Sequence, residues 1–300
     1  MRHATPPPEP PSLSGDKAQR EREAALAFYS DPANLGAAFS KPGFHAYGSA
    51  DVRDTLNQAF AFKCAYCESS YGPTQPVAIE HYRPKGRVTV AERNPDGTVK
   101  QVPKPGYYWL ASNWENLLPS CTDCNSPRGQ LVPGAAKART LGKANQFPLV
   151  SEAKRASQPG EEKRERRLLL HPYLDEPGEH LHFVDDPDSL ADGEVEPAPR
   201  GGTRRPSPMG TASIEVYALQ RRELINARKA MLTRVRLALM DVEDDLDDIA
   251  EHGLTPKRQE RYERHVAELK GFANPDQEYS AMCAQVINQA FEALFGRKPA

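Results

Sequence analysis

Two Cys-X-X-Cys pairs, Cys64 with Cys67 and Cys121 with Cys124, restrict what this chain can fold into more than any other feature. Each short pair directs two sulfurs at one point, and two pairs supply the four thiolates of a tetrahedral Zn²⁺ site. A redox role is the alternative, but the chain has only five cysteines and four fall in these pairs, which favours zinc. The 53 residues between Cys67 and Cys121 exceed an ordinary zinc ribbon, so an inserted structure is expected between the pairs.

The segment that separates the pairs predicts a hairpin followed by a helix. Residues 77–82 are rich in apolar and β-branched side chains and lie between two prolines, which indicates a short strand. A second apolar run, 116–121, enters the second pair, and Thr122 or Asp123 is placed to cap a helix after it. This arrangement would bring four polar side chains to one point: Glu80, His81, Asn116 and Asn125.

The order of these residues resembles the HNH endonuclease family. Its ββα-metal motif carries an acidic residue and a histidine on the first strand, an asparagine before the second strand, and a histidine or asparagine at the helix start. Four stretches also occur in a fixed order: IEHYRPK, GYYWLASNWENLLPSCTDCN, GKANQFPL and RRLLLHPYLDEP. They resemble the HNH subunit of Septu-type antiphage systems, which is also found beside some retrons. The resemblance spans roughly residues 60–185, and weaker similarity continues at 214–228 and 279–282.

The resemblance implies an α+β fold with a ββα-metal core, a zinc site, flanking helices and a mainly helical C-terminal region. It also implies a metal-dependent endonuclease in the bacterial cytoplasm, a defence effector that acts on nucleic acid, with DNA favoured, beside an ABC-type ATPase subunit. Two alternatives stay open. One is the same chemistry on RNA such as tRNA, because nothing in the sequence recognises a 2′-hydroxyl. The other is a non-catalytic zinc module that bridges partners.

The residue types suit phosphodiester hydrolysis, which needs a deprotonated water and a cation on the phosphate. His81 is the candidate general base, because imidazole is suited to taking a proton from water near neutral pH. Glu80 and Asn125 offer the oxygen ligands that Mg²⁺ or Mn²⁺ prefers, and Asn116 is expected to orient the imidazole. The alternative interpretations are a structural histidine, a turn asparagine at 116 and a helix-start amide at 125.

Three basic residues are candidates to bind the substrate phosphate: Arg83, Lys85 and Arg128. A solvated surface is the alternative for Arg83 and Lys85. Arg128 stands where the family pattern more often has lysine, a change that keeps the charge but alters the hydrogen-bond geometry.

Overall charge argues against strong unaided binding of a polyanion. The formal net charge is −2, whereas proteins that bind nucleic acid alone tend to be basic. Residues 61–130 carry eight Lys or Arg and six Asp or Glu, so the candidate site is only slightly positive. Affinity is therefore expected to come from a partner. The chain has no apolar run near 18 residues and no signal-peptide pattern, which predicts a cytoplasmic protein.

Composition along the chain predicts four regions. They are a disordered tail at 1–15, a region with N-terminal helices at 16–184, which the resemblance implies is an HNH nuclease domain, a linker at 185–209 and a helical region at 210–300. Helices are expected at 16–29 and 52–62, and the Asn-Pro-Asp-Gly sequence predicts a hairpin turn within 87–105.

Apolar residues recur at three- and four-residue steps between Leu224 and Ile249, which predicts a long amphipathic helix. Gly253 is expected to end it, and Thr255 to begin a second helix that runs to about residue 270. A last helix is expected at 279–295. The run 241–251 holds seven acids and no base, and its alternatives are imitation of nucleic acid, docking on a basic partner surface and a solvated helix face.

Overall fold

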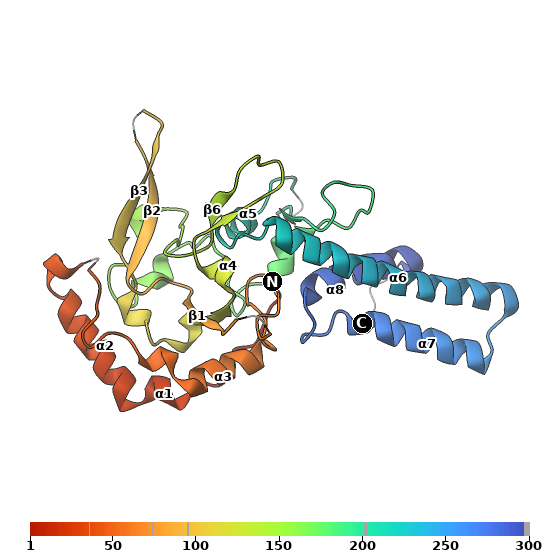
Figure 1. Cartoon of the computed structure of the whole chain (residues 1–300), viewed down its shortest axis with the longest axis horizontal. Coiled ribbons are helices and arrows are strands. Elements are labelled where there is room, and N and C mark those ends of the chain that lie inside the picture. Colours follow the sequence, from red (N-terminus) through yellow and green to blue (C-terminus); the bar gives the residue numbers. More distant parts are fainter. Residues whose placement is uncertain (36, 74, 95, 201–202, 297–300) are drawn as a thin grey trace.

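The computed structural model describes residues 1–35, 37–73, 75–94, 96–200 and 203–296 of the 300-residue chain. Figure 1 shows an elongated molecule, with short helices and two-stranded sheets toward one end and long helices toward the other. This is the mixed helix and sheet composition that the sequence predicted. Within the described ranges, no helix is both long enough and apolar enough to cross a membrane.

The N-terminal helices lie along one side of the strand-containing end. They are α1 (Pro11–Ser14), α2 (Asp16–Tyr29) and α3 (Ala50–Ala59). The predicted helix at 16–29 is confirmed, whereas α3 begins and ends earlier than the predicted 52–62. The backbone of Ala61 and Phe62 is left-handed, with φ of 50° and 57°, and a right-handed helix cannot continue through that conformation.

The segment predicted to be a disordered tail, 1–15, is instead held against the core. Leu13 is 1% exposed and packs in a small apolar cluster with Val52. The indole Nε1 of Trp114 donates to the Pro7 carbonyl over 2.7 Å. Proline lacks an amide hydrogen but keeps its carbonyl acceptor, so an extended Pro-rich segment can still bond to a core side chain.

The two predicted strands lie between the cysteine pairs, and the predicted helix begins at the second pair. Strand β1 (Ala78–His81) pairs antiparallel with β4 (Leu117–Ser120), and His81 lies opposite Leu117. Helix α4 (Thr122–Asn125) follows β4 directly. The order strand, strand, helix therefore appears where the sequence predicted it.

The start of α4 is not set by a capping side chain. Cys121 is the N-cap and makes no side-chain cap bond, so the prediction that Thr122 or Asp123 caps the helix is wrong. Cys121 is fixed instead by its place in the cysteine cluster described below.

The other strands also form two-stranded antiparallel sheets. The pairs are β2 (Arg87–Arg93) with β3 (Val99–Pro105), β5 (Arg128–Gln130) with β6 (Arg139–Leu141), and β7 (Leu181–Phe183) with β8 (Val195–Pro197). The β2–β3 hairpin confirms the prediction within 87–105, and Figure 1 shows it projecting from the molecule. Short 3₁₀ helices occur in the connections between the helices and strands, at Pro32–Asn34, Ala46–Gly48, Tyr108–Leu110, Trp114–Asn116, Glu152–Lys154, Glu161–Arg164 and Pro177–Glu179.

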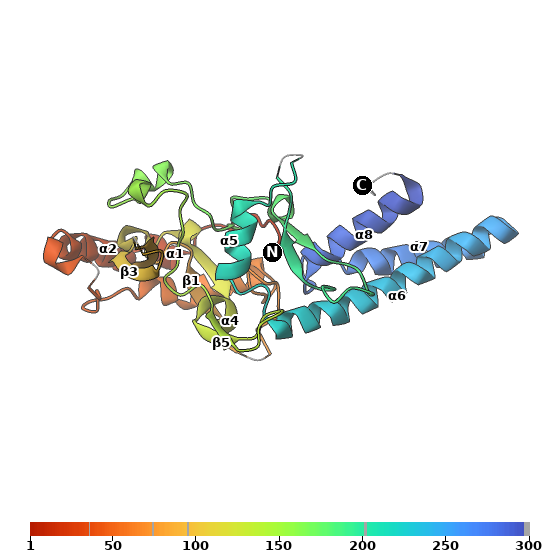
Figure 2. The same cartoon turned by 90° about the horizontal axis from the view of Figure 1, so that it is seen from above.

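The C-terminal region is helical, as predicted. It contains α5 (Pro208–Val216), α6 (Arg222–His252), α7 (Pro256–Gly271) and α8 (Ser280–Phe295). Gly253 ends α6 and the Thr255 side chain caps α7, which confirms the predicted break. Figure 2 shows α5 between β1 and the long helix α6.

The acidic run on α6 is partly neutralised within the chain. The Asp245 carboxylate pairs with Arg261 and with His265, the latter at 2.8 Å. Asp248 pairs with Arg258 at 3.0 Å. These two carboxylates therefore hold α6 to α7.

The segment predicted to be a linker, 185–209, contains structure of its own. It holds strand β8 and the start of α5, and Asp185 and Asp192 accept hydrogen bonds from Arg236 of α6 at 2.8 and 3.3 Å. Gly201 and Gly202 lie outside the described residues. One apolar core runs from the strand-containing end into the long helices, so the segment does not separate two cores.

Candidate functional site

The four predicted cysteines form one buried cluster. Their sulfur atoms all lie within 4.8 Å of one another, and Cys67 Sγ is 3.8 Å from Cys121 Sγ. A tetrahedral zinc with bonds of about 2.3 Å would separate its sulfurs by roughly 3.8 Å. The cluster fits a zinc ion, and Cys64 and Cys124 complete the set of four.

Two buried arginines that the sequence analysis did not identify lie beside this cluster. Arg221 is 5% exposed, and its guanidinium donates to Cys67 Sγ at 3.3 Å and to Cys124 Sγ at 3.5 Å. Arg228 is 1% exposed and close enough to Cys67 to interact electrostatically. Four thiolates around Zn²⁺ leave an excess of two negative charges, which two guanidinium groups would balance.

The sequence does contain a pattern that could have identified Arg228 as a buried charge. It lies on the apolar stripe of α6, four residues after Leu224 and three before Met231, where a charged side chain must be buried. A buried charge requires a partner of opposite sign. Arg221 precedes the helix and has no comparable signal.

We expect Arg221→Met to weaken retention of zinc by about 10- to 100-fold, because it removes N–H donors from the metal-bound sulfurs. Competition with a chromogenic chelator measures this change. Arg222→Met is the matched control, since Arg222 is the adjacent residue but is exposed. Equal zinc release from Arg221→Met and wild type would contradict the role of Arg221.

The first cysteine pair also anchors the C-terminal helices. The rings of Tyr66 and Tyr217 stack with centroids 3.9 Å apart. Glu68 accepts a hydrogen bond of 3.0 Å from the Ser280 hydroxyl. The ammonium group of Lys63 donates to the Pro275 carbonyl at 2.6 Å. The cysteine cluster therefore lies where the strand-containing end meets the helical region.

A pocket of about 690 Å³ lies beside the cluster, and α4 contributes to both. Its lining includes Glu80, His81, Lys85, Arg87 and Asn125. The structure therefore brings Glu80, His81 and Asn125 to one pocket, and Asn125, predicted at a helix start, is the last residue of the short helix α4. The other predicted site residues, Asn116, Arg83 and Arg128, do not line it.

The imidazole of His81 is buried, 5% exposed, and held on both nitrogens. Nε2 donates to the Ala111 carbonyl at 2.9 Å, so Nδ1 carries the lone pair and accepts from Lys85 Nζ at 3.3 Å. The Tyr47 ring meets the imidazole edge-on, with centroids 4.5 Å apart. Burial, together with the charge of Lys85, holds the pKa of His81 well below its ordinary value, so the ring is neutral at pH 7.

Glu80 pairs with a lysine that the sequence analysis did not single out. The side chain of Lys143 is fully buried, and its Nζ lies 2.5 Å from Glu80 Oε1 and 2.9 Å from the His81 carbonyl oxygen. Burial raises the pKa of Glu80, and the positive charge of Lys143 opposes this shift. Lys143 occurs in the GKANQFPL stretch, where no local pattern distinguishes it from a surface lysine.

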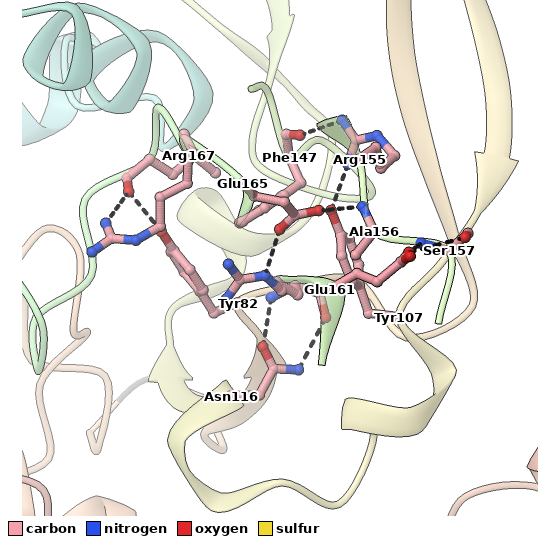
Figure 3. Close-up of polar contacts among 12 residues, drawn as sticks. Tyr82, Tyr107, Asn116, Phe147, Arg155, Ala156, Ser157, Glu161, Glu165 and Arg167 are labelled. Carbon is pink, nitrogen blue, oxygen red and sulfur yellow. Dashed lines mark hydrogen bonds and ion pairs between the residues drawn. The ribbon is translucent and has the colours of Figure 1, made fainter. Parts of the chain in front are cut away.

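Among the described residues, the Asn116 side chain bonds to the loop that follows β1 and to the Leu110 carbonyl, and not to the imidazole. Its Oδ1 accepts from the Arg83 amide at 2.7 Å, and its Nδ2 donates to the Arg83 carbonyl at 3.0 Å. Figure 3 shows this amide below the Glu165 network. We expected Asn116 to orient the imidazole, and in the structure the atoms that bond to the ring come from Ala111 and Lys85.

The Arg83 guanidinium is engaged away from the pocket. Its Nε donates to the buried Glu165 carboxylate at 3.1 Å, which also accepts from the Tyr107 hydroxyl at 2.6 Å (Figure 3). Arg128 is exposed and pairs with Asp123 at 3.1 Å. Of the three predicted phosphate-binding residues, only Lys85 faces the pocket.

The buried cysteines and the mixed fold define a protein equipped to bind a structural metal. The chain is 33% identical to Septu protein PtuB of Bacillus mycoides (strain KBAB4), over 295 residues that cover 91% of this chain and 89% of that protein. It is 28% identical over 100 residues to Septu protein PtuB of Bacillus thuringiensis, covering 33% of this chain and 32% of that protein. No family model matches the chain, and no solved structure matches it. The chain belongs to the Septu PtuB family, which supports a role in antiphage defence.

Proposed function

We propose that the chain is a metal-dependent HNH endonuclease, the effector subunit of a Septu-type defence system, with DNA favoured as its substrate. The observation that carries the proposal is the shared pocket, which Glu80 and His81 reach from β1 and Asn125 reaches from α4. The strand, strand, helix order of these elements resembles the HNH motif. Membership of the Septu PtuB family supports the same function.

His81 is the proposed general base. A neutral imidazole with its lone pair on Nδ1 can take a proton from water, and the Ala111 carbonyl holds the ring in that tautomer. Lys85 donates to the same Nδ1 atom in the structure. A substrate phosphate entering the pocket would attract the Lys85 ammonium, and Nδ1 would then be open to water. Asn116 acts indirectly, because it fixes the loop after His81.

Glu80 and Asn125 are the proposed ligands for Mg²⁺ or Mn²⁺. Both offer oxygen donors to one pocket, and oxygens are the ligands these ions prefer. Glu80 Oε1 is bonded to Lys143, so Oε2 is the carboxylate oxygen left for the ion. The bound ion would supply positive charge that stabilises the phosphate and the leaving oxygen.

The test of this function is a cleavage assay with two substrates. Purified wild-type protein is incubated with supercoiled plasmid or total tRNA while Mg²⁺ is titrated, with and without an ABC-type ATPase encoded beside it. The proposal expects metal-dependent nicking or linearisation of the plasmid. Cleavage of tRNA alone would move the substrate class to RNA. No cleavage of either substrate would leave the bridging zinc module as the better explanation.

We expect the isolated protein to bind nucleic acid weakly, because its formal net charge is −2 and the pocket is only locally basic. Fluorescence anisotropy on a labelled duplex should give a dissociation constant no tighter than about 10⁻⁶ M at physiological salt, with steep weakening as salt rises. Addition of the proposed ATPase partner should tighten binding. Nanomolar affinity of the isolated chain would contradict the expectation that a partner supplies affinity.

A further inference from the structure

The segment from Gly142 to Asn145 is fixed against the end of α4. The Lys143 amide donates to the Cys124 carbonyl at 2.8 Å, and the Ala144 amide donates to the Asn125 carbonyl at 2.6 Å. Gly142 has φ of +122°, and a Cβ there would overlap the Ser126 carbonyl oxygen. Only glycine allows so close an approach, so the backbone position of Lys143 is tied to α4.

The buried Lys143 side chain extends from this segment to β1 and contacts two of its residues. Its Nζ lies 2.5 Å from Glu80 Oε1 and 2.9 Å from the His81 carbonyl oxygen, and the side chain is 0% exposed. A buried ammonium without partners is strongly unfavourable, so these contacts hold it firmly. One lysine therefore connects the strand that carries Glu80 and His81 to the helix that carries Asn125.

We propose that Lys143 is a positioning residue of the cleavage site, which sets the position of the Glu80 carboxylate relative to Asn125. This inference rests on the proposed function. The two proposed metal ligands come from different elements, and the connection from Asn125 through Ala144 and Lys143 to Glu80 joins them. Because Lys143 occupies Oε1, it also presents Oε2 as the oxygen for the ion. Small displacements of ligands weaken metal sites and slow catalysis.

Mn²⁺ is the probe for the test, because its binding can be followed by electron paramagnetic resonance without any cleavage. The full chain is compared as wild type, Lys143→Met, Lys143→Arg and the control Lys137→Met, which changes an exposed lysine in the same part of the chain. We expect Lys143→Met to bind Mn²⁺ at least about 10-fold more weakly than wild type. Half-maximal cleavage should need correspondingly more metal, while KM for the nucleic acid stays unchanged. Lys143→Arg should fall between the two, because it keeps the charge but not the single-nitrogen geometry.

A purely structural lysine would lower the melting temperature without changing the metal affinity of the folded fraction, and that result would overturn the inference. If Lys143→Met does not fold, the test uses Lys143→Arg. Wild-type metal affinity in that arginine variant would also overturn the inference. If wild type and Lys143→Met bind Mn²⁺ and cleave equally well, the role of Lys143 is refuted but the proposed function stands. Wild type that neither binds Mn²⁺ nor cleaves removes both the proposed function and this inference.

Discussion

Cys121→Ser should prevent the chain from reaching its native fold. Cys121 contributes one of the four sulfurs of the buried cluster and also forms the N-cap of α4. A structural zinc contributes an apparent free energy of about 10–16 kcal/mol in small zinc-binding domains. Whole domains are stable by only about 5–15 kcal/mol. We therefore expect loss of zinc and loss of the cooperative unfolding transition together.

Zinc content per chain, measured by mass spectrometry, and near-UV circular dichroism check this expectation. Wild type should hold about one zinc per chain. Cys283→Ala is the matched control, because Cys283 is also a buried cysteine but lies in α8 outside the cluster. That control should keep its zinc and lose only on the order of 1 kcal/mol of unfolding free energy. Soluble, folded wild type without zinc would remove the four-cysteine assignment.

His81→Ala should reduce cleavage by about 10²- to 10⁴-fold, the usual effect of removing a general base. Zinc content should be unchanged, because His81 is not part of the cysteine cluster. The His81 side chain is buried and only 5% exposed. A modest loss of stability is therefore expected beside the loss of activity, and the two effects must be separated.

His171 provides the control for that separation. It is also buried, its Nε2 donates to the Glu115 carbonyl at 2.9 Å, and the Tyr82 ring meets it edge-on at 4.4 Å. His171→Ala should thus cost stability in a similar way. Because His171 does not line the pocket with Glu80, we expect the folded variant to cleave at the wild-type rate. Undiminished cleavage by folded His81→Ala would refute the assignment of the base.

The predictions that the structure confirms rest on local patterns, in which residues close together in the sequence determine the structure. The Gly253 and Thr255 signals marked the break between α6 and α7, because helix ends depend on backbone conformation and capping within a few residues. The spacing within each cysteine pair indicated metal binding for the same reason. The apolar and β-branched residues between two prolines also located β1, although its partner β4 begins 36 residues after β1 ends.

The tertiary structure alone decided which charged groups meet. Lys143 pairs with Glu80 across 63 residues of sequence, and Arg221 reaches Cys67 across 154. No local pattern distinguishes such residues from solvated ones, because the reason for their burial is a partner brought close only by folding. Arg83 is the opposite case, since its position in the IEHYRPK stretch suggested phosphate binding and Glu165 engages it instead. The sequence by itself thus determined the cysteine cluster and the break between α6 and α7, while long-range ion pairing determined which basic residues face the pocket.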